Sequence, residues 1–549
     1  MMKTNNRSQK ALPWAFLAAA YALVLCLLAV NHTRLMTAEA ASDLMLARQL
    51  NAEHGLLAHG FRYLADARLF GVVNLYQLGL LLFPSNWTAV RLLAMAVLLA
   101  GLAASFLYMA KGADAGDAAV WAAGGILLPL SAAWGTMVSF GGTWLGSVII
   151  AFLGTGLVLR LMESRERVIL RGVLLLGLSF LQGMQGTASL LLFVLPCLVT
   201  GIALFLRAAW QAESIPALLK TGETRLLAAG LAAFIAAMVG FVLNVKFLAP
   251  RFGFETLMTQ DFRSFTLAGM QQQLDGLAQT FGWIDMVKAA SARGLLGVLA
   301  VVLTGSGIIC LVLLALRGEK LGASVSMRVL MLMGFSAMAM GMAVNTMCDV
   351  TGGSAAGLWL TGVLLMVLAG FTVIRLAKVE LPGLKVMLAA ALALMLVVEA
   401  AGTMLGANSD AEGGELFTVS DAMDRSIVLD SAAQVLMQGG YAEGLGLAED
   451  AGILTALSNG RLEVWVPDYL DRPGDTTAKG QLIAHADTKP QGRCFLVYTG
   501  TTYRTDPVIR WMGREPDWQG VVNDTVCLLY TADSYEALTA PLLLPQPGN

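Results

Sequence analysis

Long apolar runs separated by short polar connections fill most of the chain. A membrane-spanning helix needs about 20 mostly apolar residues. On that criterion eleven spans are predicted, at 12–30, 89–110, 117–135, 143–162, 168–184, 187–207, 225–246, 293–316, 327–347, 353–375 and 385–404. The first apolar run is long for a signal peptide and no clear small-residue cleavage site follows it, so we expect a retained anchor helix. The pattern predicts a polytopic α-helical membrane protein.

The apolar run at 69–83 is short for a span, and the placement of Lys and Arg indicates how it lies. If it lies flat on the membrane surface and the N-terminus is cytoplasmic, the cytoplasmic loops hold Lys111, Arg160, Arg165, Arg167, Arg171, Arg207, Lys220, Arg225, Arg317, Lys320, Arg328, Arg375, Lys378 and Lys385. A span at 69–83 would invert every later loop and destroy this pattern, so we predict a surface helix. One of its faces should lie at the headgroup boundary, pack against other helices, or do both, because an apolar stripe recurs at helical spacing at Leu69, Val72, Val73, Tyr76, Leu80 and Phe83.

This topology gives a transmembrane domain over 1–404, with outer loops at 31–88 and 247–292, followed by an outer domain over 405–549. Helix-period segments such as SAAQVLMQGGYA alternate there with strand-period segments such as RLEVWVP, RCFLVYTG and TVCLLYTA, which predicts a small α/β domain. Cys494 and Cys527 lie in two of the strand segments. A disulfide between them is a reasonable expectation if this domain is outside the cell.

Composition and charge narrow the function. The chain is 57% hydrophobic and 13% charged, against about 25% charged residues in ordinary soluble domains, and its net charge of −2 argues against a nucleic-acid partner. The spans hold almost no ionisable residue, whereas ion-coupled transporters usually bury acids or bases near the bilayer midplane. Polar groups gather at the outer helix ends instead: Arg91, Gln182, Gln185, Asn244, Lys246, Asn345, Asp349 and Glu399. Helix ends are polar in any case, but the collective bias favours an outer-leaflet cavity, which the loop 247–292 would cover.

Two acids follow the anchor helix closely. Glu39 and Asp43 are four residues apart and so share a helix face. Neighbouring carboxylates can divide the work, one deprotonating a hydroxyl while the other binds a cation or tunes the pKa. The alternative is a solvated helix start, where acids favour the helix dipole. Asp66 and Arg68 add another acid and a cation suited to phosphate.

Several motifs together resemble the GT-C glycosyltransferases, and more narrowly an uncharacterised bacterial branch with an outer C-terminal domain. They are ASDLMLARQLNAEHGLL, RYLADARLFG, NWTAVRLLAMAVLL, LSFLQGMQGTASLLLFVLPCL and GYAEGLGLAEDAGILTALSNGRLEVWV, and they span nearly the whole chain. The resemblance implies a sugar donor linked to polyprenyl phosphate or pyrophosphate. It also implies inverting transfer to a glycan, lipid or protein hydroxyl on the outer face of a bacterial cytoplasmic membrane.

The resemblance further implies roles for individual residues. The first-loop acid that acts as base or metal ligand matches Glu39, with Asp43 one turn later, and the donor phosphate would be handled by Asp66, Arg68 and Arg91. A divalent cation, Mg²⁺ or Mn²⁺, would bind at Glu39 or Asp43. However, Ala40 stands where a second acid is usual, and VSFGGTWLG has no acid at the next outer turn. A one-carboxylate reaction without metal and a loss of activity are therefore both open.

Two other classes of function compete with a transferase. A transporter or flippase for a lipid-linked glycan would need a continuous polar track between the leaflets. A non-catalytic scaffold with an outer binding domain would leave the loop acids pointing apart into water.

Overall fold

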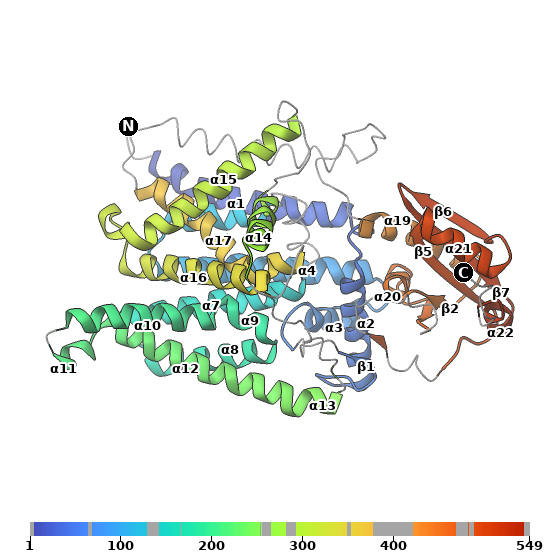
Figure 1. Ribbon diagram of the computed structural model, residues 1–549, viewed down its shortest axis with the longest axis horizontal. Helices are drawn as coiled ribbons and strands as arrows, with labels where there is room; N and C mark the ends of the chain where they lie inside the picture. The colour runs from blue at the N-terminus through green and yellow to red at the C-terminus, as the bar shows by residue number, and fades with distance from the viewer. Residues whose placement is uncertain are drawn as a thin grey trace.

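The chain forms a bundle of long helices with a small sheet at one end (Figure 1). A computed structural model describes residues 5–63, 69–128, 142–164, 166–212, 214–252, 254, 265–281, 292–347, 353–376, 421–467, 481–482 and 488–542. The predicted span 385–404 and the predicted domain boundary at 404 lie outside these residues. A polytopic helical membrane protein with a C-terminal α/β domain is confirmed as the fold class.

Among the described residues, seven helices are long and apolar enough to cross a membrane. They are α1 (Asn5–Val30), α4 (Trp87–Gly112), α7 (Gly142–Glu163), α10 (Val194–Gln211), α12 (Gly222–Leu243), α15 (Ala292–Arg317) and α16 (Val325–Met347). Shorter apolar stretches lie in α3 (Val72–Leu82), α5 (Asp117–Leu127), α8 (Val168–Met184) and α17 (Gly353–Leu376). The predicted helix at 187–207 is broken, because Phe193 leaves helical geometry (φ −145°, ψ −54°) between α9 (Thr187–Leu192) and α10.

The remaining helical segments connect these elements. They are α2 (Ala38–Glu53), α11 (Ile215–Leu218), the π-helical η2 (Asn244–Leu248), α13 (Ala249–Phe252), α14 (Leu267–Thr280) and the 3₁₀ turn η3 (Gly318–Leu321). The η2 turn continues α12 directly into α13.

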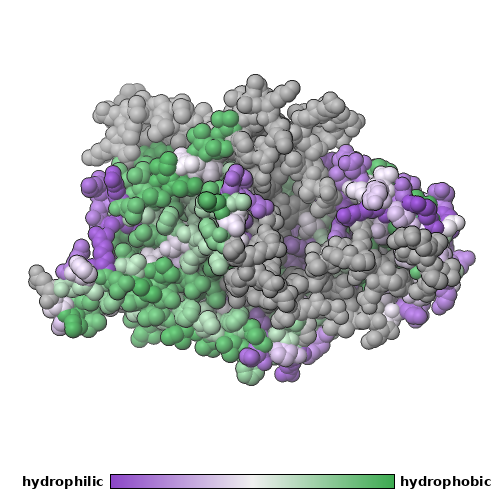
Figure 2. Space-filling view, viewed as in Figure 1, coloured by the Kyte–Doolittle hydropathy of each residue, from purple (hydrophilic) through white to green (hydrophobic). Residues whose placement is uncertain are grey.

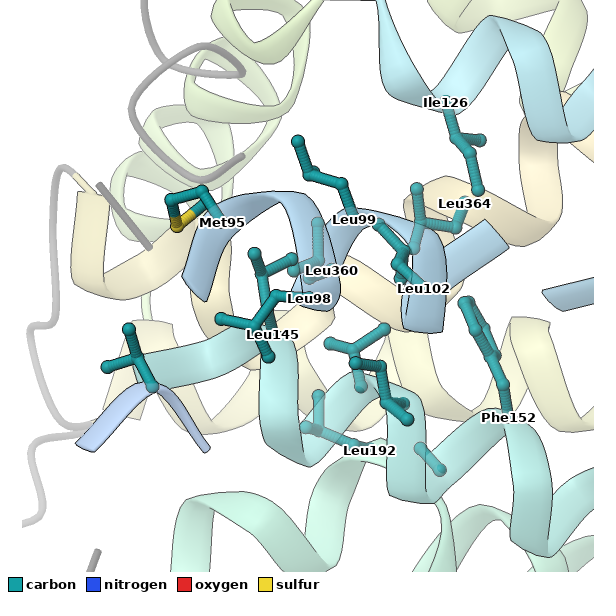
Figure 3. Close-up of a cluster of buried hydrophobic side chains, with 14 of the residues drawn as sticks. Met95, Leu98, Leu99, Leu102, Ile126, Leu145, Phe152, Leu192, Leu360 and Leu364 are labelled. Carbon is teal, nitrogen blue, oxygen red and sulfur yellow. The ribbon is translucent and has the colours of Figure 1, made fainter. Parts of the chain in front are cut away.

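Apolar side chains from α4, α5, α7, α9 and α17 meet in the middle of the bundle (Figure 3). Leu99, Phe152 and Leu364 are almost completely buried there. The outer surface of the bundle is also apolar, whereas the sheet end is mainly hydrophilic (Figure 2). A bundle that is apolar both inside and outside is typical of helices solvated by lipid.

Loops that the distribution of basic residues places on one side of the membrane do meet at one end of the bundle. Arg375 Nη1 donates a hydrogen bond of 3.0 Å to the carbonyl of Asp114, so the end of α17 contacts the α4–α5 turn. Ser324 Oγ donates at 3.0 Å to the carbonyl of Ala113 in the same turn. These contacts agree with the loop assignment, while the cytoplasmic orientation of this end stays a prediction.

Helix α3 is the predicted surface helix and is too short to cross a bilayer at 11 residues. The inner part of its predicted stripe packs against the protein, since Val72, Val73, Tyr76 and Leu80 are buried. The exposed apolar side chains are Leu78, Leu81 and Leu82, which lie outside the stripe, and Phe83, its last member. The stripe from Val72 to Leu80 is therefore the packing face, and any contact with lipid is made by the opposite edge and by Phe83.

The C-terminal domain is a five-stranded mixed sheet with strand order β3-β2-β5-β7-β6. Strands β2, β3 and β5 are parallel to one another, whereas β7 runs antiparallel to β5 and β6. Its elements are α19 (Asp421–Gln438), β2 (Glu443–Gly446), α20 (Ala448–Leu457), β3 (Glu463–Trp465), β5 (Cys494–Thr501), α21 (Thr502–Met512), β6 (Trp518–Val522), β7 (Thr525–Ala532) and α22 (Tyr535–Thr539). A separate two-stranded pairing joins β1 (Phe61–Arg62), in the loop 31–88, to β4 (Gln481–Leu482).

The expected disulfide between Cys494 and Cys527 is wrong. The register of β5 and β7 pairs Cys494 with Ala532 and Cys527 with Thr499. The cysteines are thus offset by five positions, or about 16 Å at about 3.3 Å per residue, against about 7 Å between the Cα atoms of a disulfide. An odd offset also puts them on opposite faces of the sheet. Both are free and buried.

Candidate functional site

The two acids predicted as a pair lie in different environments on α2. Thr37 caps this helix by accepting a hydrogen bond of 3.2 Å from the Ala40 amide. Glu39, in the first turn, is exposed. Asp43, one turn further on, is only 2% exposed. The helical spacing holds, but only Asp43 is enclosed by the fold.

Arg91 is the cation that holds the connection just before α2. It belongs to the second turn of α4 and is 9% exposed. Its Nη1 donates to the carbonyl of His32 and its Nη2 to the carbonyl of Leu35, both at 2.8 Å. Charge-assisted bonds of this kind fix the α1–α2 connection to α4. Arg91, predicted to bind donor phosphate, thus also has a structural role.

Tyr76 of α3 connects the acid to the cation. Its side chain is 4% exposed and its hydroxyl hydrogen-bonds to Arg91. Burial raises the pKa of Tyr76 to about 12, the charge of Arg91 opposes this rise, and the charge of Asp43 adds to it. The phenol therefore keeps its proton at neutral pH, and both charges lie close enough to influence it. Asp43, Tyr76 and Arg91 form what we call the acid cluster.

The acid cluster adjoins an apolar surface through α3. Tyr76 lies on the buried face of this helix, while Leu81, on its other edge, is 68% exposed. Figure 1 shows α2 and α3 between the bundle and the sheet. One short helix thus has the acid cluster on one side and an apolar, accessible edge on the other.

The glutamines predicted to line a cavity hold helix ends together. Gln185 Nε2 donates at 2.7 Å to the carbonyl of Phe70, just before α3. Gln182 Nε2 donates at 2.8 Å to the carbonyl of Ser189 in α9. Both glutamines are buried. Gln185 therefore ties the start of α3 to the end of α8, whereas Gln182 ties α8 to α9.

The other predicted site residues are only partly placed. Lys246 lies in η2 and is exposed. Asp66, Arg68 and Asp349 lie outside the described residues, so their predicted roles stay predictions. The start of the predicted loop 247–292 does reach the loop 31–88, since Phe252 stacks on His59 with ring centroids 4.4 Å apart.

The donor set gives little support for a resident metal ion. Within the described part of the chain, His, Cys, Asp and Glu form no group of three or more that could hold one. Glu39 and Asp43 also differ in exposure, and the charge of Arg91 acts on Tyr76, which the charge of Asp43 also influences. We therefore derive no step that passes through Mg²⁺ or Mn²⁺.

Sequence reasoning missed Tyr76 as a site residue and assigned it to an apolar stripe. Its phenol was the only polar side chain in that stripe. Buried tyrosine hydroxyls usually find a hydrogen-bond partner. A hydroxyl on the inner face of a surface helix was therefore a signal for a polar group beneath it.

Comparison with known proteins gives structural matches alone. No family model matches the sequence, and no curated protein matches it significantly. The chain is similar to the crystal structure of ArnT from Cupriavidus metallidurans bound to undecaprenyl phosphate, with 13% identity, a TM-score of 0.49 and coverage of 97% of this chain and 99% of that chain. It is also similar to the crystal structure of ArnT from Cupriavidus metallidurans in the apo state, with 12% identity, a TM-score of 0.49 and coverage of 98% of this chain and 100% of that chain.

Proposed function

We propose that the protein is a membrane glycosyltransferase that moves a sugar from a polyprenyl phosphate or pyrophosphate donor to an acceptor hydroxyl on the outer face of the cytoplasmic membrane. The observation that supports this most is the position of the acid cluster. It is a buried carboxylate, a protonated phenol and a guanidinium next to a short helix with an exposed apolar edge. Such a place suits a substrate with a charged, reactive head and a hydrocarbon tail.

Asp43 is the proposed general base. It takes the proton of the acceptor hydroxyl as the hydroxyl oxygen attacks the anomeric carbon of the donor. The bond from that carbon to the phosphate oxygen breaks, and its electron pair leaves with the polyprenyl phosphate. Attack opposite the leaving group inverts the configuration at the anomeric carbon.

Arg91 and Tyr76 are proposed to stabilise the negative charge that develops in this step and to hold the reacting groups in place. The guanidinium holds the carbonyls of His32 and Leu35 and keeps a positive charge at the site, which favours the anionic leaving group. The Tyr76 hydroxyl retains its proton at neutral pH and can donate it in a hydrogen bond. Neither group needs to change its charge during turnover.

One experiment can distinguish glycosyl transfer from transport of the lipid-linked donor across the membrane. The purified chain is placed in lipid vesicles with radiolabelled sugars linked to short polyprenyl phosphates, and product formation is measured alongside donor movement between leaflets. A transferase yields labelled acceptor and free polyprenyl phosphate, with inverted configuration. Donor movement without any bond cleavage would make the protein a transporter and refute the proposal.

A further inference from the structure

The C-terminal domain contacts the helix that bears Asp43. Helix α20 packs on α2 so closely that a Cβ added at Gly452 would lie 3.3 Å from the Cβ of Ala41. Ala41 is completely buried. Figure 1 shows α20 next to α2 at the boundary between the bundle and the sheet. The domain thus packs directly on the helix that bears Asp43, two residues from it in the sequence.

The same domain also supplies a cap to α4, the helix that bears Arg91. The first amide groups of a helix have no partner within it. Asn86 accepts from the Ala89 amide at 3.0 Å, as an ordinary cap. Asn459, 372 positions away in the sequence, accepts from the Trp87 amide at 2.8 Å through Oδ1. Helix α4 is therefore capped partly by the other domain.

The turn that presents Asn459 is built for this contact. Asn459 and Gly460 both have left-handed backbone conformations, with φ of 56° and 76°. A Cβ at Gly460 would lie 2.7 Å from the Trp87 ring, so only glycine allows the turn to come this close. The asparagine also suits its position, because Asn tolerates positive φ better than most residues.

A third contact reaches the α1–α2 connection. Ser426 of α19 donates from Oγ to the carbonyl of Met36. Arg91 holds the neighbouring carbonyls of His32 and Leu35 in the same connection. The domain and the cation therefore fix this short segment together.

We propose that the C-terminal α/β domain positions the acid cluster and that Asn459 is its principal positioning residue. This inference rests on the proposed function for its kinetic consequence. Trp87 and Arg91 are four residues apart, so they lie on one face of α4. The hydrogen bond at Trp87 sets the position of that face, while α20 sets the position of α2. Together they fix the separation of Arg91 from Asp43.

Two substitutions at Asn459 distinguish the effect of its hydrogen bond from the effect of its left-handed backbone conformation. Asn459→Gly keeps a residue that accepts positive φ but removes the acceptor oxygen. Asn459→Asp keeps an acceptor oxygen in the same place and places its negative charge at a helix N-terminus, where it is favourable. The glycine variant should lower kcat about five- to tenfold, as expected for one lost hydrogen bond, while KM for the lipid donor stays within about twofold. The aspartate variant should restore kcat.

Amide hydrogen exchange gives a readout that needs no substrate. In Asn459→Gly, exchange should accelerate in segment 31–37 and in α2 as well as at Trp87, and in Asn459→Asp it should match wild type. Faster exchange confined to Trp87, or a kcat equal to wild type in an active enzyme, would overturn the inference. If the wild-type chain transfers no sugar, the proposed function fails, and the exchange of segment 31–37 still decides whether the domain positions the cluster.

Discussion

Removing the Arg91 guanidinium should loosen the connection between α1 and α2. Arg91→Met keeps an unbranched apolar stem but leaves the carbonyls of His32 and Leu35 without the two donors that the structure shows. Arg91→Lys keeps the positive charge, but an ammonium group cannot reproduce the planar fork that reaches both carbonyls. The pair of variants therefore separates charge from geometry.

The size of the effect follows from the contacts. A hydrogen bond from a charged donor contributes about 1.5–3 kcal/mol. Arg91→Met removes two such bonds, which together contribute about 3–6 kcal/mol. Because about 1.4 kcal/mol is a factor of ten in an equilibrium constant, Arg91→Met should raise the equilibrium constant for local opening about 10²- to 10⁴-fold, and amide exchange by the same factor. Arg91→Lys, which loses at least one of the two bonds, should accelerate it about tenfold.

Hydrogen exchange of segment 31–37 in lipid nanodiscs measures this opening. The amides of Leu35 and Met36 are suitable probes, since each donates to a main-chain carbonyl within this segment. Arg207→Met, which removes an exposed arginine of α10, is the matched control and should leave the segment unchanged. If Arg91→Met exchanges at the wild-type rate, Arg91 does not hold this connection and the acid cluster has no fixed geometry.

Other predictions concern acid stability, helix packing and the cysteines. Although partial burial raises the pKa of Glu53, hydrogen bonds from Gln49 and from the amides of His59 and Gly60 outweigh it, and the pKa falls below its ordinary value of 4.5. The ionised Glu53 therefore stabilises the fold above pH 4.5, and this stabilisation is lost as the pH falls through the lower pKa of the folded state. Amide exchange of the loop after α2 should accelerate over that pH range in wild type but not in Glu53→Gln. An acceleration that persists in Glu53→Gln would contradict the assignment. Gly183→Ala would place a Cβ 1.9 Å from a main-chain oxygen of α12 and should lower the melting temperature markedly, whereas Gly177→Ala in the same helix meets nothing within 4 Å and should not; equal melting temperatures would refute this packing. Under denaturing, non-reducing conditions Cys494 and Cys527 should both react with an alkylating reagent, and a mass two hydrogens lighter for that pair would show a disulfide instead.

Much of the membrane architecture could be predicted because its signals are local or statistical. The shortness of the 69–83 run and the placement of basic residues together indicated that α3 does not span the membrane, and the structure agrees. The alternation of helix and strand periods predicted the α/β domain, which the sheet confirms. Both the length of an apolar run and the period of apolar residues reflect whether lipid, water or protein surrounds each segment, so they can be read from the local sequence.

Features that depend on distant contacts could not be predicted. The spacing of Glu39 and Asp43 indicates a common helix face, but it does not show that the fold encloses only the second acid. The register of β5 and β7 decides whether Cys494 and Cys527 can bond, and strand pattern alone does not specify it. The contact of Trp87 with Asn459 joins residues with no local relation in the sequence.

The most direct test of the proposed site is the turnover number of two matched variants, Asp43→Asn and Glu39→Gln. Each removes one carboxylate charge from α2, but Asp43 is enclosed in the acid cluster and Glu39 is exposed. With a polyprenyl-phosphate sugar donor, Asp43→Asn should lower kcat about 10²- to 10⁴-fold, the usual contribution of a general base, while Glu39→Gln should stay close to wild type. Wild-type turnover in Asp43→Asn, or a loss confined to Glu39→Gln, would contradict the assignment.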